Sequence, residues 1–248
     1  MIFANDFIGQ DKAGRTMHFY GGDEEDTLQR NLEKMPEDWY YRDKTITYVF
    51  NNNGHRCKEI EQIDLDNYIL FTGCSHTEGI GLEIETTFPY LVAKELGCDY
   101  YNMGIAASGL DVLEYNLLTW FHKVKKKPKF IVIQWPDHSR YVTFGEDNTH
   151  ILPNGTWNAE NEHKRFLLSS EEAGFFHARK YIATRMIESV IDVPIIKMTF
   201  SSLAQYDGNS LILRRLDYAR DCSHTGIKSH ISIAEQIVSE YKRLYAQN

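Results

Sequence analysis

The sequence is short of positive charge, of long apolar runs and of cysteine, and each shortage excludes a class of protein. Lysine and arginine number 27 against 35 aspartate and glutamate residues, which gives a formal net charge of −8. An acidic chain is a poor general partner for a phosphate backbone or an anionic membrane, and the one basic stretch, residues 123–129, is typical of a solvated turn. We therefore expect neither nucleic acid nor membrane as a partner.

The other two shortages concern location and redox state. No uncharged segment approaches the roughly 18 residues that a membrane-spanning helix needs, and residues 1–11 have no basic start and no long apolar stretch. The four cysteines are scattered and form no C-x-x-C pair, so a disulfide framework is not expected. These features favour a reducing, cytoplasmic setting, although a virus-encoded or particle-borne protein would share them.

The hydrophobic content of 42% supports a large core, and its pattern predicts an α/β fold. Short apolar runs alternate with longer amphipathic segments, as the strands and crossover helices of a parallel sheet do. The run 130–135 is apolar almost throughout, so it should be a central strand buried on both faces. The expected strands are 67–72, 99–103, 130–135 and 193–200, and the expected helices are 86–96, 110–121, 171–190 and 227–245.

Two regions depart from this alternation. Residues 1–62 are expected to form an N-terminal extension in front of an α/β domain over 63–248. Within the extension, Thr45–Asn51 alternates polar and apolar residues and Asn53-Gly54 is a strong turn signal, so we predict a small β-hairpin that continues from His55. From about 136 to 170 the pattern dissolves, which we interpret as an insertion over the edge of the sheet.

Three short segments hold residue types suited to nucleophilic catalysis, and in an open parallel sheet the loops after the strands converge. Ser75 follows the first predicted strand among small residues that permit a sharp turn. Gly104 follows the second strand, and its amide can approach a substrate oxygen because it has no side chain. Asp221 stands three residues before His224, so one turn can present a carboxylate and an imidazole together. The segments jointly predict a nucleophile, its base and an orienting acid.

These segments resemble the SGNH (GDSL) hydrolase family in residue type and in order along the chain. The family's first block, G-D-S-x-T-x-G-x-G, is similar to residues 73–81, with Cys74 in place of the aspartate. Its second block, N-x-G, matches residues 102–104, and its last block, D-x-x-H, matches residues 221–224. The resemblance covers most of the chain, from about residue 45 to the last helix.

The resemblance implies a flavodoxin-like fold, a three-layer α/β/α sandwich with a mostly parallel central sheet. It also carries the nucleophile over to Ser75, the general base to His224 and the orienting carboxylate to Asp221. The oxyanion of the tetrahedral intermediate would be held by the amides of Ser75 and Gly104.

One departure from the family pattern concerns the oxyanion hole. Family members follow the third strand with G-x-N-D, whose asparagine is an oxyanion donor, whereas this chain reads Gln134-Trp135-Pro136-Asp137-His138. Loss of one such donor typically lowers turnover by roughly 10²–10³-fold. We expect His138 to supply the donor, ahead of Gln134, because its ring N–H can donate from a loop.

The expected function is that of a serine esterase which works through an acyl-enzyme and needs no cofactor or metal. The insertion is polar and aromatic and contains no long apolar lid, which favours small acyl groups, such as acetyl, on a glycan or other small-molecule ester. We expect His76, Asn102 and Trp135 to contact the substrate. The sequence does not predict the oligomeric state.

Two alternatives stay open. The missing asparagine motivates a weakly active or non-catalytic binding or structural protein on the same fold. A zinc site could be built from Cys74, His76, Cys222 and His224, which the fold would bring near one another. The metal reading is the weaker one, because Cys74 and His76 flank Ser75 on a turn and should point to different sides.

Overall fold

A five-stranded parallel sheet forms the centre of the computed structural model, which describes residues 7–137, 140–144, 151–154, 174–200 and 210–245. Its strand order is β4-β3-β5-β8-β9. All residues of β3 and β5 are buried, and β5 lies in the middle of the sheet, as its apolar sequence predicts. The strands are β3 (Tyr68–Thr72), β4 (Asp99–Asn102), β5 (Ile131–Gln134), β8 (Ile195–Thr199) and β9 (Leu211–Ile212).

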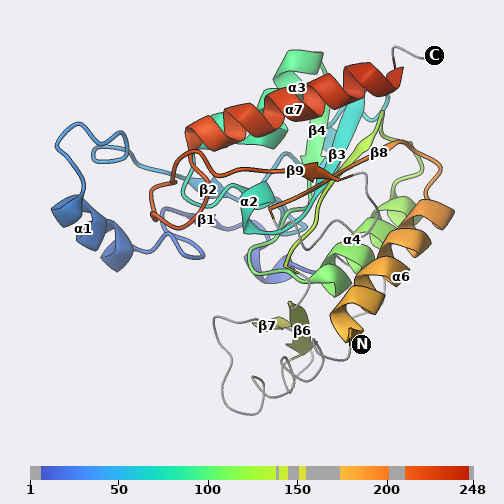
Figure 1. The fold of residues 1–248 in the computed structure, drawn as a ribbon, viewed down its shortest axis with the longest axis horizontal. Helices are drawn as coiled ribbons and strands as arrows, with labels where there is room; N and C mark the ends of the chain where they lie inside the picture. The colour runs from blue at the N-terminus through green and yellow to red at the C-terminus, as the bar shows by residue number, and fades with distance from the viewer. Residues whose placement is uncertain (1–6, 138–139, 145–150, 155–173, 201–209, 246–248) are drawn as a thin grey trace.

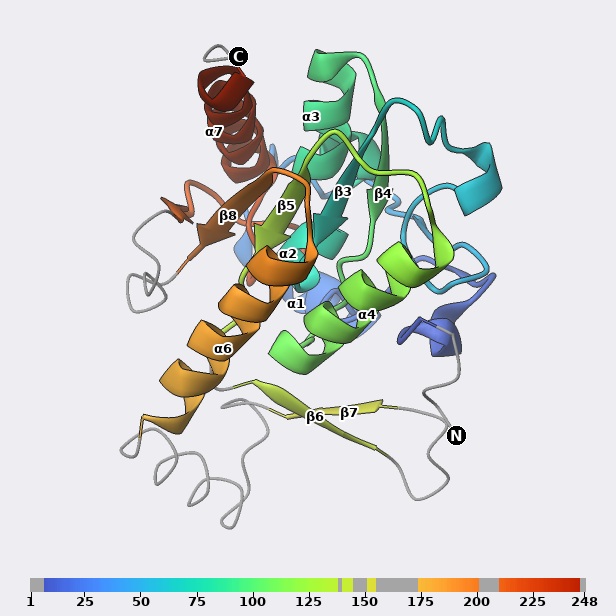
Figure 2. The same cartoon turned by 90° about the vertical axis from the view of Figure 1, so that its right-hand side faces the viewer.

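Two helices cover each face of the sheet, which gives the predicted three layers. Helices α3 (Phe88–Leu96) and α7 (Ile227–Tyr245) pack against each other on one face, and α4 (Leu110–Lys123) and α6 (Phe175–Val190) lie on the other (Figure 2). Each face has its own core. Trp120, Leu117 and Ile187 belong to the core under α4 and α6, and Val92, Ile233 and Ile237 belong to the core under α3 and α7.

Local sequence signals account for where these helices begin and end. Helix α3 has Pro89 in its first turn, where the missing N–H costs nothing, and ends at Gly97 in the left-handed conformation (φ +61°). Helix α7 spans the predicted residues 227–245 and carries basic residues in its last turn, which suits the helix dipole. No helix within the described residues is long and apolar enough to cross a membrane.

The N-terminal region contains a small antiparallel pair, but its strands differ from the predicted ones. Strand β2 (Tyr48–Val49) pairs with β1 (Thr16–Met17), not with the segment after Gly54. The side-chain oxygen of Asn51 accepts hydrogen bonds from the backbone N–H groups of Asn53 and His55, each at 3.0 Å. This Asx-type turn closes the chain locally, so the residues after Gly54 leave the strand direction.

Several other elements were not expected from the sequence. Helix α1 (Glu25–Lys34) has no buried residue and projects from the body of the molecule (Figure 1). In the insertion, β6 (Tyr141–Phe144) pairs antiparallel with β7 (Ile151–Asn154), and Arg140 lies against Gly109 at the start of α4 rather than over a sheet edge. Single 3₁₀ turns occur at Gln10–Lys12, Ile60–Gln62 and Ile84–Thr86.

Candidate active site

Ser75 lies at the carboxyl end of β3, at the first position of the short helix α2 (Ser75–Glu78). The turn that leads to it is very tight, because a Cβ added to Gly73 would lie 2.2 Å from Thr77 Oγ1. Only glycine fits there. Within the described part of the chain, the backbone N–H of Ser75 has no hydrogen-bond acceptor. This N–H therefore still has its hydrogen-bonding capacity, next to the Ser75 hydroxyl.

The loop before α7 brings an imidazole to this hydroxyl from 149 residues further along the chain. His224 Nε2 lies 2.9 Å from Ser75 Oγ, and His224 Nδ1 hydrogen-bonds Asp221 Oδ2. The other oxygen, Asp221 Oδ1, accepts the backbone N–H groups of Ser223 and His224 at 3.0 Å. The three residues predicted to act together thus form one continuous hydrogen-bonded row.

The electrostatics of this row favour a base at His224 Nε2. The side chain of Asp221 is fully buried, which by itself would raise its pKa, but its hydrogen bonds with His224 and the N–H of Ser223 outweigh burial and hold the pKa below its usual value. Asp221 is therefore ionised at neutral pH and keeps a proton on His224 Nδ1. The lone pair of Nε2 then faces the Ser75 hydroxyl, as nucleophilic activation of a serine requires.

His76, which follows Ser75 on α2, lies beside this row. Its ring centroid is 5.2 Å from that of His224 and 4.5 Å from that of Phe200. His76 Nδ1 is 3.0 Å from Thr225 Oγ1, while no hydrogen bond is formed by Nε2 with any described residue. His76 is half-buried, so the structure does not contradict the predicted contact between His76 and the substrate.

Gly104 and Asn102 serve the packing of α2 in this structure. A Cβ on Gly104 would lie 2.6 Å from the backbone nitrogen of Glu78, so glycine allows the loop after β4 to contact α2. Asn102 is buried, donates to Thr77 O at 2.8 Å and accepts the Gly104 N–H at 2.9 Å. The predicted substrate contact of Asn102 is therefore replaced by a structural one, and the Gly104 amide predicted for the oxyanion is already bonded.

The segment after β5 also differs from the prediction. Trp135 is 2% exposed and packs in the core under α4 and α6, with Lys180 Nζ above its ring, so it is a core residue rather than a substrate contact. The Gln134 amide oxygen accepts the Cys74 N–H at 3.2 Å, and its nitrogen donates to Trp135 O, which removes Gln134 as an oxyanion donor. His138, the preferred candidate, lies outside the described residues.

The alternative zinc site does not form. Among the described residues, no group of three or more histidine, cysteine, aspartate or glutamate side chains could hold a metal ion. Cys74 Sγ is 3.0 Å from the Gln134 amide oxygen, and both ring nitrogens of His224 are engaged by Ser75 and Asp221. These potential ligands therefore face other partners.

Residues of the N-terminal extension hold the His224 loop, a role that the sequence analysis missed. Arg220 and Asp23 form a two-pronged ion pair at 2.9 and 2.8 Å, with side chains only 2% and 1% exposed. Gly22 lies against the hydrogen-bonded row, since a Cβ there would be 3.2 Å from Asp221 Oδ2 and 3.5 Å from His224 Cε1. The extension is thus one wall of the site.

A second buried ion pair holds the Ser75 side of the site. Lys12 Nζ lies 2.7 Å from Glu78 Oε1, and the two side chains are 4% and 0% exposed. Glu78 Oε2 also accepts the backbone N–H of Ala106, at 2.5 Å, in the loop after β4. The pair joins positions 66 residues apart, and no local sequence pattern indicates it.

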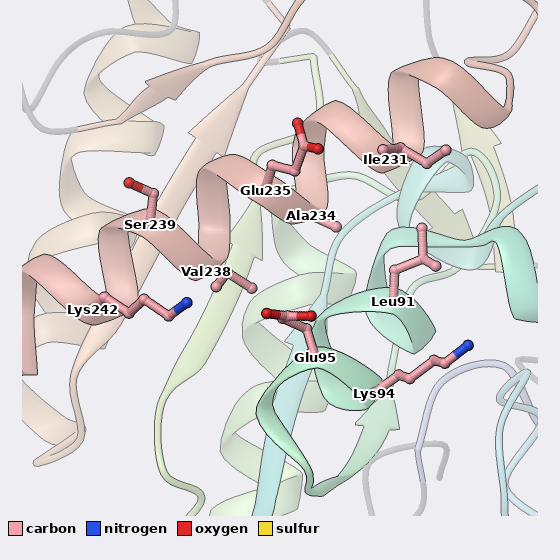
Figure 3. A pocket seen from close by; sticks show the side chains of 9 residues that line it. All are labelled: Leu91, Lys94, Glu95, Ile231, Ala234, Glu235, Val238, Ser239 and Lys242. Atoms are coloured by element: carbon pink, nitrogen blue, oxygen red, sulfur yellow. The ribbon is translucent and has the colours of Figure 1, made fainter.

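A groove on the described surface lies away from Ser75. It has a volume of about 660 Å³ and runs between α3 and α7, lined by Leu91 of α3 and by Ala234 and Val238 of α7 (Figure 3). Charged side chains, among them Glu95 and Lys242, stand along it. It includes none of the residues around Ser75, so it is not part of the candidate active site.

Comparison with known proteins adds similarity at the level of whole structures. No protein-family model and no curated protein sequence matches the chain. It is similar to Est2A, an acetyl xylan esterase from the rumen bacterium Butyrivibrio proteoclasticus, at 14% identity and a TM-score of 0.45, over 73% of this chain and 64% of that one. The chain thus spans just under two thirds of that enzyme's length.

Two further solved structures are similar over a larger share of their own length. A catalytic mutant of Axe2, an acetylxylan esterase from Geobacillus stearothermophilus, matches at 14% identity and a TM-score of 0.41, over 71% of this chain and 94% of that one. A putative G-D-S-L family lipolytic protein from Desulfitobacterium hafniense DCB-2 matches at 10% identity and a TM-score of 0.38, over 70% and 98%. At this identity the similarity concerns the fold alone.

Proposed function

We propose that this protein is a serine esterase. The observation that carries the proposal is the row from Ser75 Oγ through His224 to Asp221, at the carboxyl end of a parallel strand. Ser75 Oγ would attack the acyl carbon while its proton moves to His224 Nε2, and the same proton would then leave with the alcohol. Water, deprotonated by His224, would cleave the acyl-enzyme and release the acid.

The oxyanion hole sets the expected rate. The Ser75 N–H is a ready donor, but the Gly104 N–H is held by Asn102, and Pro136 stands where the family has its asparagine. We keep His138 as the proposed additional donor. A site short of one donor works roughly 10²–10³-fold more slowly, so turnover should be low, and His138→Ala should reduce it further.

We propose small acyl groups on carbohydrate as the preferred substrate class. Support comes from the polar and aromatic residues that follow β5, of which Tyr141 is half-buried on β6. A flat aromatic ring can stack on a sugar face, whereas a long acyl chain would need an extended apolar channel. Acetylated xylan oligosaccharides and p-nitrophenyl acetate are therefore the substrates to test first, with p-nitrophenyl palmitate as the comparison.

Hydrolysis of p-nitrophenyl acetate and labelling by a fluorophosphonate test the proposal. The wild-type protein should be labelled, Ser75→Ala should show neither labelling nor turnover, and Asp221→Asn should retain labelling with turnover reduced by about 10²–10⁴-fold. Ser189→Ala, at an exposed serine on α6, is the matched control and should behave as wild type. Equal turnover in Ser75→Ala and wild type would exclude the mechanism.

A non-catalytic glycan-binding protein is the second candidate. It is favoured by one observation, the engagement of the Gly104 amide by Asn102, which closes one side of the expected oxyanion hole. A wild type that is inert toward every ester and fluorophosphonate, yet binds acetylated oligosaccharides in calorimetry equally well as Ser75→Ala, would support this candidate over the esterase.

A further inference from the structure

A chain of hydrogen bonds leads from helix α3 to His76, beside the candidate nucleophile. The backbone N–H of Phe88, at the start of α3, donates to His230 Nδ1 at 2.9 Å. His230 Nε2 lies 3.0 Å from Thr225 Oγ1, which lies 3.0 Å from His76 Nδ1. His230 and Thr225 are 1% and 0% exposed, so water does not compete for these bonds.

The direction of every proton in this chain follows from its first bond. A backbone N–H only donates, so His230 Nδ1 carries no proton and a neutral ring must carry it on Nε2. Nε2–H then donates to the Thr225 oxygen. The buried Thr225 hydroxyl has one acceptor left among the described residues, His76 Nδ1, and donates to it. His76 Nδ1 is thereby an acceptor, and the proton of a neutral His76 resides on Nε2.

We propose that Thr225 and His230 are positioning residues that hold His76 neutral with its proton on Nε2, and that this N–H donates to an oxygen of the bound ester. The inference rests on the esterase function proposed above. His76 is adjacent to Ser75 in sequence, its ring lies against that of His224, and its Nε2 has no partner among the described residues. Because the Gly104 N–H is held by Asn102 and Pro136 stands in place of the asparagine, two expected donors are missing, and His76 would act beside the proposed His138.

A neutral His76 also suits the chemistry of its neighbour. His224 becomes positively charged when it accepts the serine proton, and a second charge at a ring distance of 5.2 Å would oppose that step. Burial lowers the pKa of His230 to about 3 and, together with the charge of His224, lowers the pKa of His76 well below its usual value. The Phe88 N–H at the start of α3 likewise disfavours a proton on His230 Nδ1.

Nitrogen NMR of the histidine rings tests the relay without any need for activity. In the wild-type protein the His76 signals should show a protonated Nε2 and an unprotonated, hydrogen-bonded Nδ1. In Thr225→Val, which removes the hydroxyl but keeps the shape, the two tautomers of His76 should mix, and Thr225→Ser should restore the wild-type pattern. A proton on Nδ1 of His76 in the wild type would overturn the relay.

Kinetics with p-nitrophenyl acetate test the role of the His76 N–H. His76→Phe keeps an aromatic ring beside Phe200 but has no donor, and we expect kcat/KM to fall roughly tenfold, the value of one ordinary hydrogen bond. His76→Gln, whose amide nitrogen reaches about as far as Nε2, should recover much of the loss. Thr225→Val should lower kcat/KM and Thr225→Ser should not. Unchanged kcat/KM in His76→Phe would overturn the donor role.

The two arms separate failure of this inference from failure of the esterase proposal. If the wild type is active, Ser75→Ala is dead and His76→Phe is unchanged, the esterase stands and the donor role is wrong. If the wild type hydrolyses no ester, the esterase and the donor role fall together, while the NMR arm still decides whether the relay fixes the tautomer of His76.

Discussion

Individual residues in the two site loops adopt backbone conformations that their side chains disfavour. Cys222, between Asp221 and His224, has φ +55°, and Ala107, in the loop after β4, has φ +60°. They are the two non-glycine residues with positive φ within the described chain. Such strain persists where surrounding contacts enforce it, and it often accompanies functional sites. Here the left-handed turn at Cys222 lets Asp221 Oδ1 accept two backbone N–H groups of the same loop.

Replacement of Cys222 by glycine should therefore stabilise the protein. A left-handed conformation costs an ordinary residue about 1–2 kcal/mol, of which glycine returns about 0.5–1 kcal/mol in the unfolded chain, so Cys222→Gly should gain up to about 1 kcal/mol in urea unfolding. Ser223→Gly is the control, because the neighbouring residue has no positive φ and should lose stability on the same change. A loss in Cys222→Gly equal to that in Ser223→Gly would contradict this account.

Elements far apart in the sequence meet at the site because each supplies one loop to it. β3 ends at Ser75, β4 ends before Gly104, and the loop before α7 carries His224. The N-terminal extension lies outside the sheet, and its turn at Gly22 packs against Asp221 and His224. The extension thereby supports the Asp221–His224 loop, although none of its residues is proposed to react with the substrate.

Gly22→Ala should lower activity more than stability. Its added Cβ would stand 3.2 Å from Asp221 Oδ2, so the Asp221 and His224 side chains must shift by a few tenths of an ångström, and small shifts of this kind are costly in catalysis. We expect kcat/KM on p-nitrophenyl acetate to fall at least severalfold. Gly14→Ala is the contrast, since its φ of +67° makes it lose stability while its open surroundings leave the site unaffected. The reverse ranking would show that Gly22 does not position the row.

The buried Lys12–Glu78 ion pair links the extension to α2, and its loss should lower the free energy of unfolding. Lys12→Met would leave the fully buried Glu78 carboxylate without its partner, and loss of one member of such a pair costs about 3–5 kcal/mol. The double variant Lys12→Met/Glu78→Gln should recover a large part of that loss, because no unpaired charge remains. Urea unfolding of the single and double variants measures both values, and additive losses would argue against a direct pair.

At the scale of the whole molecule, buried histidines make stability depend on pH. Burial lowers the pKa of His55 and of His230 to about 3, against about 6.5 in an unfolded chain. Below pH 6.5 the unfolded chain binds these protons and the folded protein does not. The contribution of these histidines to the free energy of unfolding is therefore fully present above pH 6.5. As the pH falls, it decreases by about 1.4 kcal/mol per pH unit for each group.

Unfolding free energies at pH 7.5, 5.5 and 4.5 check this expectation. The folded protein should lose stability steadily across the range, and His55→Gln, which removes one of the buried histidines, should show a slope smaller by about 1.4 kcal/mol per pH unit. Wild-type stability that stays constant from pH 7.5 to pH 4.5 would show that neither histidine is held neutral.

Much of the architecture was predictable because strands and helices depend on residues close together in sequence. The apolar run of β5 indicated its central place, and the periodicity of α7 predicted its limits. The turn at Asn53-Gly54 was misread as a hairpin, since the Asn51 side chain redirects the chain there. The prediction for Trp135 was wrong because the sequence does not distinguish an aromatic core residue after a strand from an aromatic residue in a binding site.

The sequence by itself determined the candidates for the chemistry, because the spacing of Asp221 and His224 and the glycine before Ser75's turn are local requirements. Only the tertiary structure decided which candidates meet. The 2.9 Å contact of Ser75 with His224 spans 149 residues, and the relay through Thr225 and His230 depends on how α2, α3 and α7 pack. The same packing places Asn102 where it donates to the backbone of α2. Strand order and helix placement set the neighbours of each side chain, and no local sequence pattern encodes them.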